Sequence, residues 1–408
     1  MGKGQNEILQ RFCMRVAIVC DWLTNVGGAE KVLLEIHRLY RQAPIYTSKY
    51  SPRGISWFDD AEVRTGWLQI FPVCFRRLLG PLRARWFSHL DLSEYDLVIS
   101  VTGAEAKNVC RLKPGAKHIS YCHAPTQYYW QLYDEYVKNP GFGILNPVVR
   151  FFFKLLVKPM RKKDFVAAQR VDAFVTISGY TKELIAKYYK REATVVHPPV
   201  EVESFQRDAA LRQKMCCSVG APSSAPSSAA PSSSRSIHAE NFPNYYITTS
   251  RQVNWKRLDL VVKACVKLKR ELLVVGEGPE HARLVKMASG CDFVKFLPLQ
   301  NREELAKLLV GAKGYIFPSL EPFGIAPVEA LAAGCPVIAF GEGGVLDYIR
   351  DGKNGVLFEK QTVSALVEAV EKFEKIKFDS GVISRSAEKF SVKRFDKEMR
   401  EFVDEKVV

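Results

Sequence analysis

The sequence has no long hydrophobic run, although 47% of its 408 residues are hydrophobic. A helix that crosses a membrane needs about 20 consecutive apolar residues, so the sequence predicts no membrane-spanning helix. The first 20 residues, MGKGQNEILQRFCMRVAIVC, also lack the apolar core of a signal peptide. We therefore expect a cytoplasmic protein, either free or attached peripherally to a membrane surface.

The CxxC motif and the Asp-x-Asp motif are absent as well. The ten cysteines form no CxxC motif, and Cys20, Cys122 and Cys335 lie in apolar runs. This distribution argues against a zinc site or a disulfide framework and favours buried, apolar thiols. No Asp-x-Asp pair is present to link a metal ion to a diphosphate. We expect no metal and no cofactor, with Arg, Lys and helix N-termini neutralising any bound phosphate.

Positive charge dominates the first half of the chain. The net charge is +15, and residues 1–200 contain 29 Lys and Arg against 17 Asp and Glu. Such a surface attracts anionic partners. Basic and aromatic residues alternate in segments 71–89 and 146–163, as in helices that lie on an anionic bilayer. Two ordinary domain helices with basic outer faces are an equally good interpretation. No nucleic-acid-binding module is recognisable, so we expect no nucleic-acid partner.

Two series of strand and helix patterns predict an α/β protein. The apolar run 14–20 precedes a loop with Gly27 and Gly28 and a helix that starts near Ala29. Strand, glycine loop and helix in this order open a doubly wound parallel sheet. Further strands are predicted at 97–101, 117–121, 173–177 and 194–197, and in the second half at 244–249, 271–275, 293–296, 314–317 and 336–340.

A change in composition marks the expected domain boundary. Residues 219–236 consist largely of Ser, Pro and Ala and predict a disordered insertion. A chain of this length usually divides into domains. We expect an N-terminal domain over 14–200 and a C-terminal domain over 241–385. The final segment, 390–408, has helical periodicity.

The segment EPFGIAPVEALAAGCPV, residues 321–337, is the first candidate site. Pro327 has the backbone angle of a first helical position, which places Glu329 in the opening turn and Glu321 in the preceding loop. The free amides and partial positive charge of a helix N-terminus bind anions. The segment therefore predicts a cradle for a phosphate and a sugar.

Two loops after predicted strands supply further candidates. In SRQVNWKR, Arg251 ends a strand and Lys256 precedes a helix, so both cations could clamp a diphosphate at the carboxyl edge of the sheet. An exposed basic loop without a ligand is an equally good interpretation. In VVGEGP, Gly276 ends another strand, but His281 replaces the third glycine of a GxGxxG fingerprint. A dinucleotide dehydrogenase is therefore poorly supported, and a tight turn is a sufficient explanation.

A single histidine, His123, follows a predicted strand in YCHAPTQYYW. A histidine at such a place can contact a sugar hydroxyl or transfer a proton, because its ordinary pKa lies near neutrality. A structural role is the more common alternative for an isolated histidine.

Together these motifs resemble the GT-B glycosyltransferases of family GT4, which are retaining nucleotide-sugar transferases. The resemblance covers nearly the whole chain outside 219–236. Its most specific part is the E-x7-E signature, here Glu321 and Glu329 with Phe-Gly between them. GGAE at 27–30, SRQVNWKR at 250–257 and VVGEGPE at 274–280 also match, and YCHAPTQYYWQLYDEY at 121–136 is similar to the bacterial O-antigen mannosyltransferase branch.

The resemblance implies a GT-B fold, in which two Rossmann-like, doubly wound domains face a central cleft and the helix 390–408 returns to the N-terminal domain. It implies that His123 and Glu321 are catalytic, with His123 contacting the sugar near the reaction centre. Arginine and lysine would hold the donor diphosphate, the second glutamate the ribose, and backbone amides the transferred sugar or its phosphate. The implied donor-binding residues are Gly27, Gly28, Arg251, Lys256, Gly276, Phe323, Gly324, Ile325 and Glu329.

The function implied by the resemblance is retaining transfer of a hexose to a glycan or glycolipid acceptor. GDP-mannose is the first expectation for the donor, which would make the protein a mannosyltransferase with a metal-independent, front-side mechanism. A UDP-sugar or another GDP-sugar is an alternative donor. A nucleotide-sugar 2-epimerase and a non-catalytic nucleotide-sugar-binding protein are alternative functions.

Overall fold

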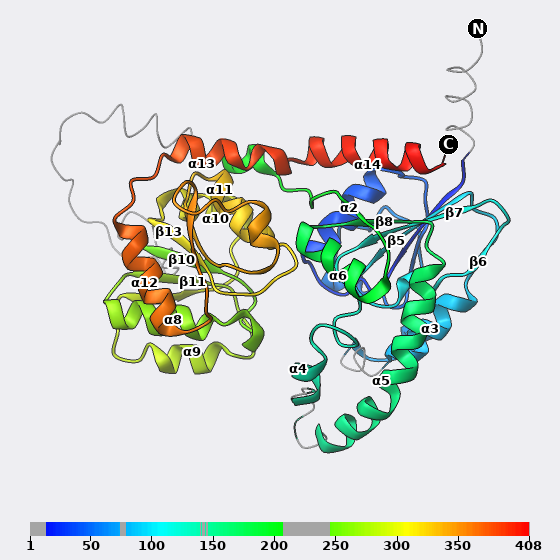
Figure 1. The fold of residues 1–408 in the computed structure, drawn as a ribbon, viewed down its shortest axis with the longest axis horizontal. Coiled ribbons are helices and arrows are strands. Elements are labelled where there is room, and N and C mark those ends of the chain that lie inside the picture. The colour runs from blue at the N-terminus through cyan, green and yellow to red at the C-terminus, as the bar shows by residue number, and fades with distance from the viewer. Residues whose placement is uncertain are drawn as a thin grey trace, which may run out of the picture. The chain divides into compact units, whose positions relative to one another are not determined.

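The structure is a computed structural model and describes residues 14–73, 79–138, 140, 143, 146–206 and 245–407. The insertion predicted at 219–236 lies outside these residues, as do positions 74–78 of the basic segment 71–89. The chain divides into two compact units, one of residues 1–199 with 393–408 and the other of residues 200–392 (Figure 1). Among the helices of the described ranges, none is long and apolar enough to cross a membrane.

The first unit is built on a parallel sheet of seven strands in the order β3-β2-β1-β5-β7-β8-β9. Strand β1 pairs with both β2 and β5, so the chain winds outward from this point in two directions. All six residues of β5 are buried, and central parallel strands of this kind form continuous apolar runs in the sequence. The strands are β1 (Val16–Cys20), β2 (Ile45–Thr47), β3 (Val63–Arg64), β5 (Leu97–Thr102), β7 (Lys117–Cys122), β8 (Ala173–Thr176) and β9 (Thr194–Val195), with a separate pair β4 (Asp91–Leu92) and β6 (Arg111–Leu112).

Helices cover this sheet and complete the first unit (Figure 1). In α14 the buried residues Phe395, Met399, Phe402 and Val403 recur at helical spacing, and the Phe395 ring lies against Tyr121 of β7 with 5.9 Å between ring centroids. The helices are α2 (Gly28–Leu39), α3 (Gly80–His89), α4 (Tyr133–Lys138), α5 (Asn146–Gln169), α6 (Gly179–Tyr189) and α14 (Val392–Val407), with short 3-10 turns η1 (Pro52–Gly54), η2 (Trp67–Ile70) and η4 (Ala106–Asn108).

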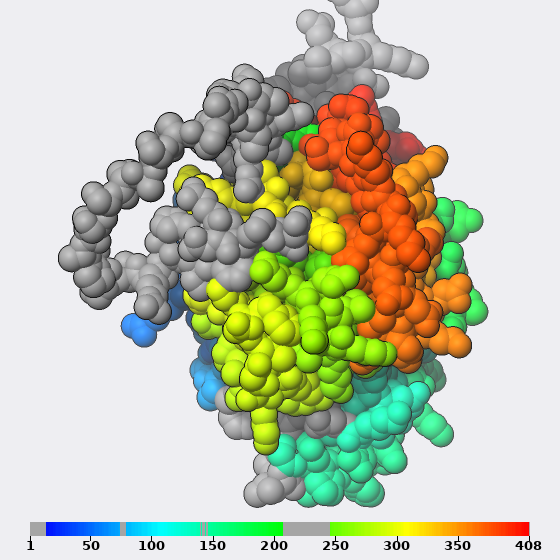
Figure 2. Space-filling view, turned by 90° about the vertical axis from the view of Figure 1, so that its left-hand side faces the viewer, coloured from blue at the N-terminus to red at the C-terminus, as the bar shows by residue number. Residues whose placement is uncertain are grey.

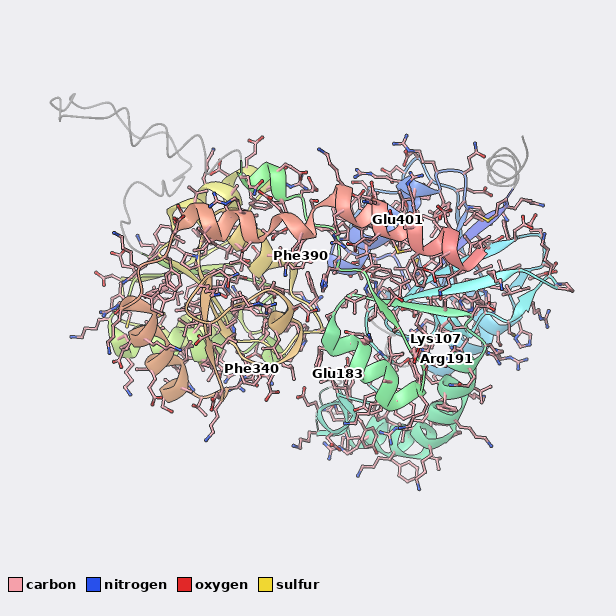
Figure 3. All side chains as sticks on the ribbon, turned by 45° about the horizontal axis from the view of Figure 1, so that its top comes forward. Lys107, Glu183, Arg191, Phe340, Phe390 and Glu401 are labelled. Atoms are coloured by element: carbon pink, nitrogen blue, oxygen red, sulfur yellow. The ribbon has the colours of Figure 1, made fainter. Side chains whose placement is uncertain are left out.

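The second unit contains a parallel sheet of six strands in the order β12-β11-β10-β13-β14-β15. Helices α8 and α12 lie side by side (Figures 1 and 2), and Phe340 of β14 packs on Phe358 of β15 inside the unit (Figure 3). The strands are β10 (Tyr246–Thr249), β11 (Leu272–Val275), β12 (Val294–Leu297), β13 (Gly314–Phe317), β14 (Val337–Phe340) and β15 (Gly355–Phe358). The helices are α8 (Leu258–Leu268), α9 (His281–Met287), α10 (Arg302–Gly311), α11 (Ile325–Ala332), α12 (Val363–Glu374) and α13 (Ser380–Ser386), with η7 (Asn254–Lys256), η8 (Gly343–Asp347) and η9 (Glu388–Phe390).

Both sheets are doubly wound, which confirms the predicted fold class. The strand order reverses between β1 and β5 in the first unit and between β10 and β13 in the second. In open α/β sheets, ligands bind outside the carboxyl ends of the strands at such a reversal. The loops after these four strands are therefore the places to look for a functional site.

Two predicted details are corrected, and part of segment 71–89 takes one of its two predicted forms. The strand expected at 194–197 is limited to Thr194–Val195. Beyond it, the Val196 amide still donates a hydrogen bond to the Thr176 carbonyl. Helix α11 begins at Ile325, two residues before Pro327, so Glu329 lies in its second turn. The aromatic residues of α3, Trp86 and Phe87, are buried in the core of the first unit, and this part of segment 71–89 is an ordinary domain helix.

Candidate functional site

The strand reversal of the second unit brings together residues from the two candidate motifs. Strand β10 leads into Ser250, Arg251 and the turn η7, and β13 leads into the loop that precedes α11. Lys256 at the end of η7 forms an ion pair with Glu321, and each side chain is only 15% exposed. The Lys256 ammonium also lies 4.5 Å from the centre of the Trp255 ring. The tertiary structure thus joins two residues that are far apart in the sequence.

Within the described ranges Arg251 has no counterion, whereas Lys256 has one. Its side chain is exposed at the end of β10. Among the described residues, none forms a hydrogen bond or an ion pair with its guanidinium, whereas its backbone carbonyl accepts hydrogen bonds from the backbone of Val253 and the hydroxyl of Ser250. A free guanidinium at the carboxyl edge of a sheet can bind a phosphate in a bidentate manner.

The Phe-Gly pair before α11 shapes the loop by packing. Phe323 is 3% exposed, and its ring contacts Tyr348 and Phe390 at centroid distances of 5.3 and 5.6 Å. Gly324 has φ = +88°, and an added Cβ would lie 2.9 Å from both the Phe317 ring and the Tyr348 hydroxyl. Only glycine fits this position, and it turns the chain so that the first amides of α11, starting at Ile325, end at the loop.

Glu329 lies on the second turn of α11 and is 8% exposed. Burial is the main cause that raises the pKa of Tyr315, and the carboxylates of Glu321 and Glu329 both raise it further. The carboxylates of Glu321 and Glu329 therefore both act on the phenol of Tyr315, the second residue of β13. Its hydroxyl lies 3.0 Å from the hydroxyl of Thr249 at the end of β10.

Gly276 has a packing role in the structure. It has φ = +116°, and an added Cβ would collide with the carbonyl oxygen of Ser250. The loops after β10 and β11 are joined here, because the buried side chain of Gln252 donates to the Gly276 carbonyl (2.5 Å) and the Gln252 amide donates to the Glu277 carbonyl (2.8 Å). His281, which replaces the third glycine of the fingerprint, lies with Nδ1 2.9 Å from the Gln252 side chain. The loops after β10 and β11 therefore hold each other in place through Gln252, the residue next to Arg251.

A second glycine pair, Gly343 and Gly344, was missed in the sequence. Gly343 has φ = +85°, and a Cβ there would collide with the Glu321 carbonyl, while one on Gly344 would collide with the Pro322 carbonyl. The Gly344 amide donates to the Glu321 carbonyl at 2.9 Å. The signal that could have revealed this support is the GEGG stretch, residues 341–344, directly after a predicted strand.

In the first unit, the glycines after β1 lie at the start of a helix. Gly27 precedes α2 and Gly28 is its first residue, and no side chain caps this end. A Cβ on Gly27 would come within 2.7 Å of the Glu30 carboxylate. Gly27 and Gly28 thus keep side chains away from the N-terminus of α2 at the strand reversal of this unit.

His123 follows β7 and holds an unsatisfied buried atom. Its amide donates to the Thr102 carbonyl at 2.8 Å, and its ring lies edge-on to Tyr121 at 5.6 Å. The residue reaches the surface, but its Nε2 atom is buried and has no hydrogen-bond partner in the part of the chain that the structure describes. Burial lowers the pKa of His123 to about 4, so the imidazole is neutral near pH 7. It can accept or donate one hydrogen bond to a ligand.

Asp21, directly after β1, is a buried carboxylate that sequence reasoning did not identify. It accepts hydrogen bonds from the backbone amides of Gly103, Ala104 and Ala106 at 2.8 to 3.0 Å and from the Thr102 hydroxyl. These donors come from the chain that leaves β5. Asp21 therefore fixes the loop at the reversal point rather than facing a ligand.

The cysteines named in the sequence analysis are confirmed as buried side chains. Cys20, Cys122 and Cys335 are free thiols with at most 4% exposure. Burial raises the pKa of Cys122 to about 12 and also raises the pKa of the other two thiols. Protonated, buried thiols are poor nucleophiles.

Most of the second half of the chain matches a known protein family. Residues 232–390 match the family model of glycosyl transferases group 1. This segment is therefore similar to that family, and we call it the group 1 segment. The match includes Arg251, the Lys256–Glu321 pair and Glu329, so the cradle lies within the group 1 segment.

Curated relatives match this chain over part of their length. The D-inositol 3-phosphate glycosyltransferase of Mycobacterium leprae is 34% identical over 144 residues, which is 32% of this chain and 34% of that protein. The putative colanic acid biosynthesis glycosyltransferase WcaL of Salmonella typhimurium is 27% identical over 172 residues, 38% of this chain and 42% of that protein. The chain thus aligns with about a third to two fifths of each of these relatives.

Solved structures share the fold of the whole chain. Anabaena Alr3699/HepE in complex with UDP-glucose superposes with a TM-score of 0.64 at 18% identity, over 96% of this chain and 100% of that one. Sucrose-phosphate synthase from Thermosynechococcus elongatus gives a TM-score of 0.65 at 15% identity, over 96% and 98%. These neighbours confirm the predicted GT-B fold.

Proposed function

We propose that this protein is a glycosyltransferase that uses a nucleotide-diphosphate sugar as donor. The observation that carries the proposal is the set of groups at the strand reversal of the group 1 segment. The loops at this reversal carry the exposed Arg251, which has no counterion among the described residues, the Lys256–Glu321 pair and the amide end of α11. Two cations and a helix N-terminus suit a diphosphate, and partly buried carboxylates suit sugar and ribose hydroxyls.

Each residue has a proposed role in this site. Arg251 and Lys256 bind the diphosphate and stabilise the negative charge that develops as it departs. Glu329 accepts hydrogen bonds from the ribose. Glu321, whose carboxylate is held by Lys256, and the amides of 323–325 bind the transferred sugar. We propose that no metal is required, since these groups supply the positive charge.

His123 is a neutral polar group of the first unit. With its pKa lowered to about 4, it is not a charged acid near pH 7. Its unpartnered Nε2 atom is proposed to hydrogen-bond a substrate hydroxyl. We propose retention of configuration by front-side attack, with the departing phosphate taking the acceptor proton.

The donor proposed first is GDP-mannose, on the resemblance of residues 121–136 to O-antigen mannosyltransferases. A UDP-sugar is the second candidate, because the neighbour Alr3699/HepE was solved with UDP-glucose. The acceptor is proposed to be a glycan or glycolipid. A nucleotide-sugar 2-epimerase and a non-catalytic binder are the competing functions, and they differ in whether nucleotide release needs an acceptor.

Thermal unfolding with a panel of nucleotides and nucleotide sugars tests the donor. A donor at about one hundred times its dissociation constant adds about 2.7 kcal/mol to stability, so we expect a clear rise of Tm with GDP and GDP-mannose that EDTA does not remove. A rise with UDP compounds instead would retain the transferase and reject mannose from GDP-mannose. No rise with any nucleotide would contradict the proposal, and nucleotide release without any acceptor would favour the epimerase.

We also propose that α5 attaches the protein to an anionic membrane surface. Val148, Phe151, Phe152, Leu155 and Leu156 are all at least 42% exposed and follow the spacing of a single helical face. Val157 comes nine residues after Val148, which is half a turn further round, and it begins the buried face. The side of α5 that points away from its own core is therefore apolar.

Lysines flank this apolar face. Lys154, Lys158 and Lys162 are exposed, whereas Arg150 is tied to the Lys138 carbonyl at 2.9 Å. Insertion of an apolar face beside lysines is typical of helices that lie in the interface of a bilayer with anionic lipids. A membrane position would also bring the protein to a glycolipid acceptor.

Vesicle sedimentation tests this attachment. The variant F151Q/F152Q/L155Q should fold normally, because these side chains are exposed, but should lose binding to vesicles that contain anionic lipid. K154Q/K158Q/K162Q should bind more weakly by about 1 kcal/mol per lysine at low salt. The matched control is K353Q/K360Q/K377Q, which removes three exposed lysines of the second unit. Unchanged binding of the apolar variant would contradict the proposal.

A further inference from the structure

Two ion pairs are buried in the first unit. Lys107 of η4 lies 2.6 Å from Asp164 of α5, and the side chains are 1% and 2% exposed. Arg83 of α3 lies 2.9 Å from Glu105, with 3% and 1% exposure. Figure 3 shows Lys107 in the interior of this unit. A buried ion pair is weak grounds for stability, because desolvation of each ion costs several kcal/mol. The burial of these ion pairs is better explained by the residues of the segment 126–130 that they bind.

The Lys107–Asp164 pair holds the chain just after His123. The Thr126 hydroxyl oxygen lies 3.0 Å from the Lys107 ammonium and 2.9 Å from the Asp164 carboxylate. The other Asp164 oxygen accepts from the Trp130 indole at 2.7 Å and from the Tyr189 hydroxyl at 2.8 Å. Both ends of the segment 126–130 are therefore bonded to one carboxylate.

The Arg83–Glu105 pair holds the middle of the same segment. Glu105 accepts hydrogen bonds from the hydroxyls of Tyr128 and Tyr129, and Arg83 donates to the Tyr128 hydroxyl at 3.3 Å. Of the side chains from 126 to 130, four are bonded to one of the two pairs. Residues from α3, α5 and the chain after β5 thus converge on a single loop.

His123 lies at the start of this loop. Only Ala124 and Pro125 separate it from Thr126, and proline restricts its own backbone and that of the residue before it. On the other side, the His123 amide is bonded to Thr102, in the chain that Asp21 fixes. The place of His123 therefore depends on the segment 126–130.

We propose that Lys107 and Asp164 are positioning residues that act through Thr126 and Trp130 to set the place and the burial of His123. The inference rests on the proposed function for the role of His123 in turnover, but the placement itself does not depend on it. The Lys107–Asp164 ion pair thereby selects one conformation of the segment 126–130. A uniquely bonded network of this kind rigidifies a site when every member is satisfied.

Two conservative variants separate Asp164 from the loop and leave the ion pair in place. Thr126→Val removes the hydroxyl, which also bonds the Ala104 carbonyl at 3.0 Å. Trp130→Phe removes the indole donor and replaces the larger ring that stacks on Tyr188 with a smaller aromatic ring. Thr47→Val is the control, because Thr47 is a buried threonine of the same unit whose hydroxyl lies near the Lys49 carbonyl instead. Both loop variants should fold, with Tm lowered by a few degrees.

The first measurement is the NMR titration of the His123 imidazole, assigned by comparison with His123→Asn. Burial alone lowers its pKa to about 4, so the wild-type ring should be neutral at about pH 5.5. In both loop variants water should reach the ring and the pKa should rise by about one unit or more toward 6.5, while Thr47→Val should behave as the wild type. An unchanged pKa in the folded loop variants overturns the inference, whatever the turnover.

The second measurement is turnover. Because a misplacement of about 1 Å can lower a rate about 100-fold, kcat should fall about 10- to 100-fold in the loop variants while KM for the donor stays within about twofold. Unchanged kcat in a variant whose His123 pKa has moved would overturn the link to turnover. If the wild type transfers no sugar, the proposed function fails, and the titration still decides the placement of His123. If Thr126→Val does not fold, Trp130→Phe carries both measurements.

Discussion

Arg251→Ala is expected to weaken binding of the nucleotide-sugar donor by about 10- to 100-fold, because a hydrogen bond to a charged group contributes about 1.5–3 kcal/mol. The free protein should be unaffected. The Arg251 side chain is exposed and, among the described residues, has no partner that its removal would leave unpaired. Titration calorimetry with the donor identified by thermal unfolding measures the change directly.

Two further variants calibrate this result. Glu329→Ala should weaken donor binding less than Arg251→Ala, since it removes contacts with ribose hydroxyls and no countercharge for the diphosphate. Arg283→Ala is the matched control, because it removes one arginine of the same unit that already pairs with Glu280 at 2.6 Å. Donor affinity that is equal in Arg251→Ala and the wild type would show that the cradle is misassigned.

Acidification from about pH 6.5 to about pH 4 is expected to destabilise the first unit by several kcal/mol. His118 lies in β7 with 0% exposure, and burial lowers its pKa, like that of His123, to about 4. In the unfolded chain the histidine pKa is about 6.5. Between these values the unfolded state binds protons that the folded state does not, so stability is lost as the pH falls. Each histidine contributes at most about 1.4 kcal/mol per pH unit.

Carboxylates whose pKa is lowered by folding change the stability of the protein at lower pH than the histidines do. The hydrogen bonds from Arg270 are the largest cause that lowers the pKa of Glu374 to about 2. The stability from this group is therefore present above its ordinary pKa of about 4.5 and is lost as the pH falls toward 2. A loss of stability that begins near pH 6.5 therefore belongs to the histidines and not to Glu374.

Urea unfolding at a series of pH values, followed by tryptophan fluorescence, measures this loss. Trp22, Trp57, Trp67, Trp86 and Trp130 lie in the first unit and Trp255 in the second, so the signal reports mainly on the first. His118→Asn and His123→Asn should each reduce the slope between about pH 6.5 and 4, and His37, whose pKa burial also lowers, contributes to the remainder. The idea would have to be abandoned if stability were constant in this window or if neither variant changed the slope.

The sequence predicted the strands well where burial leaves no alternative. The run 97–101 is continuous and apolar, and it became β5 with every residue buried. Strand β13 was expected at 314–317 and is found there. A short apolar run between turn-forming residues can satisfy its backbone and bury its side chains on both faces only inside a parallel sheet, so the local pattern is decisive.

The start of α11 was predicted two residues too late because its cause is not local. Proline is well tolerated in the first turn, where its missing amide hydrogen would have no helical partner. Pro327 alone therefore did not determine the first residue. The turn at Gly324 did, and its positive φ is required by the Phe317 and Tyr348 side chains packed against it. Neither contact can be read from the segment 321–337.

The sequence could not predict which charged residues are buried. Charged residue types usually lie on the protein surface. Nothing in the sequence spacing of Lys107, Asp164, Glu105 and Asp21 indicates that they are buried. Lys107 and its ion-pair partner Asp164 lie 57 residues apart, and the Lys256–Glu321 pair spans 65 residues. Such charges are buried only where a distant chain supplies the opposite charge, and a local pattern carries no information on that.

By itself the sequence determined the α/β class, the strands, and the glycine and cation motifs that follow them, because periodicity and backbone requirements act over a few residues. Only the tertiary structure decided which of these motifs meet. It joined Lys256 to Glu321, buried the ion pairs around Thr126, and left Arg251 and the apolar face of α5 exposed. The physical reason is that desolvation and ion pairing depend on the residues brought near in space by the strand order, and not on neighbours in the chain.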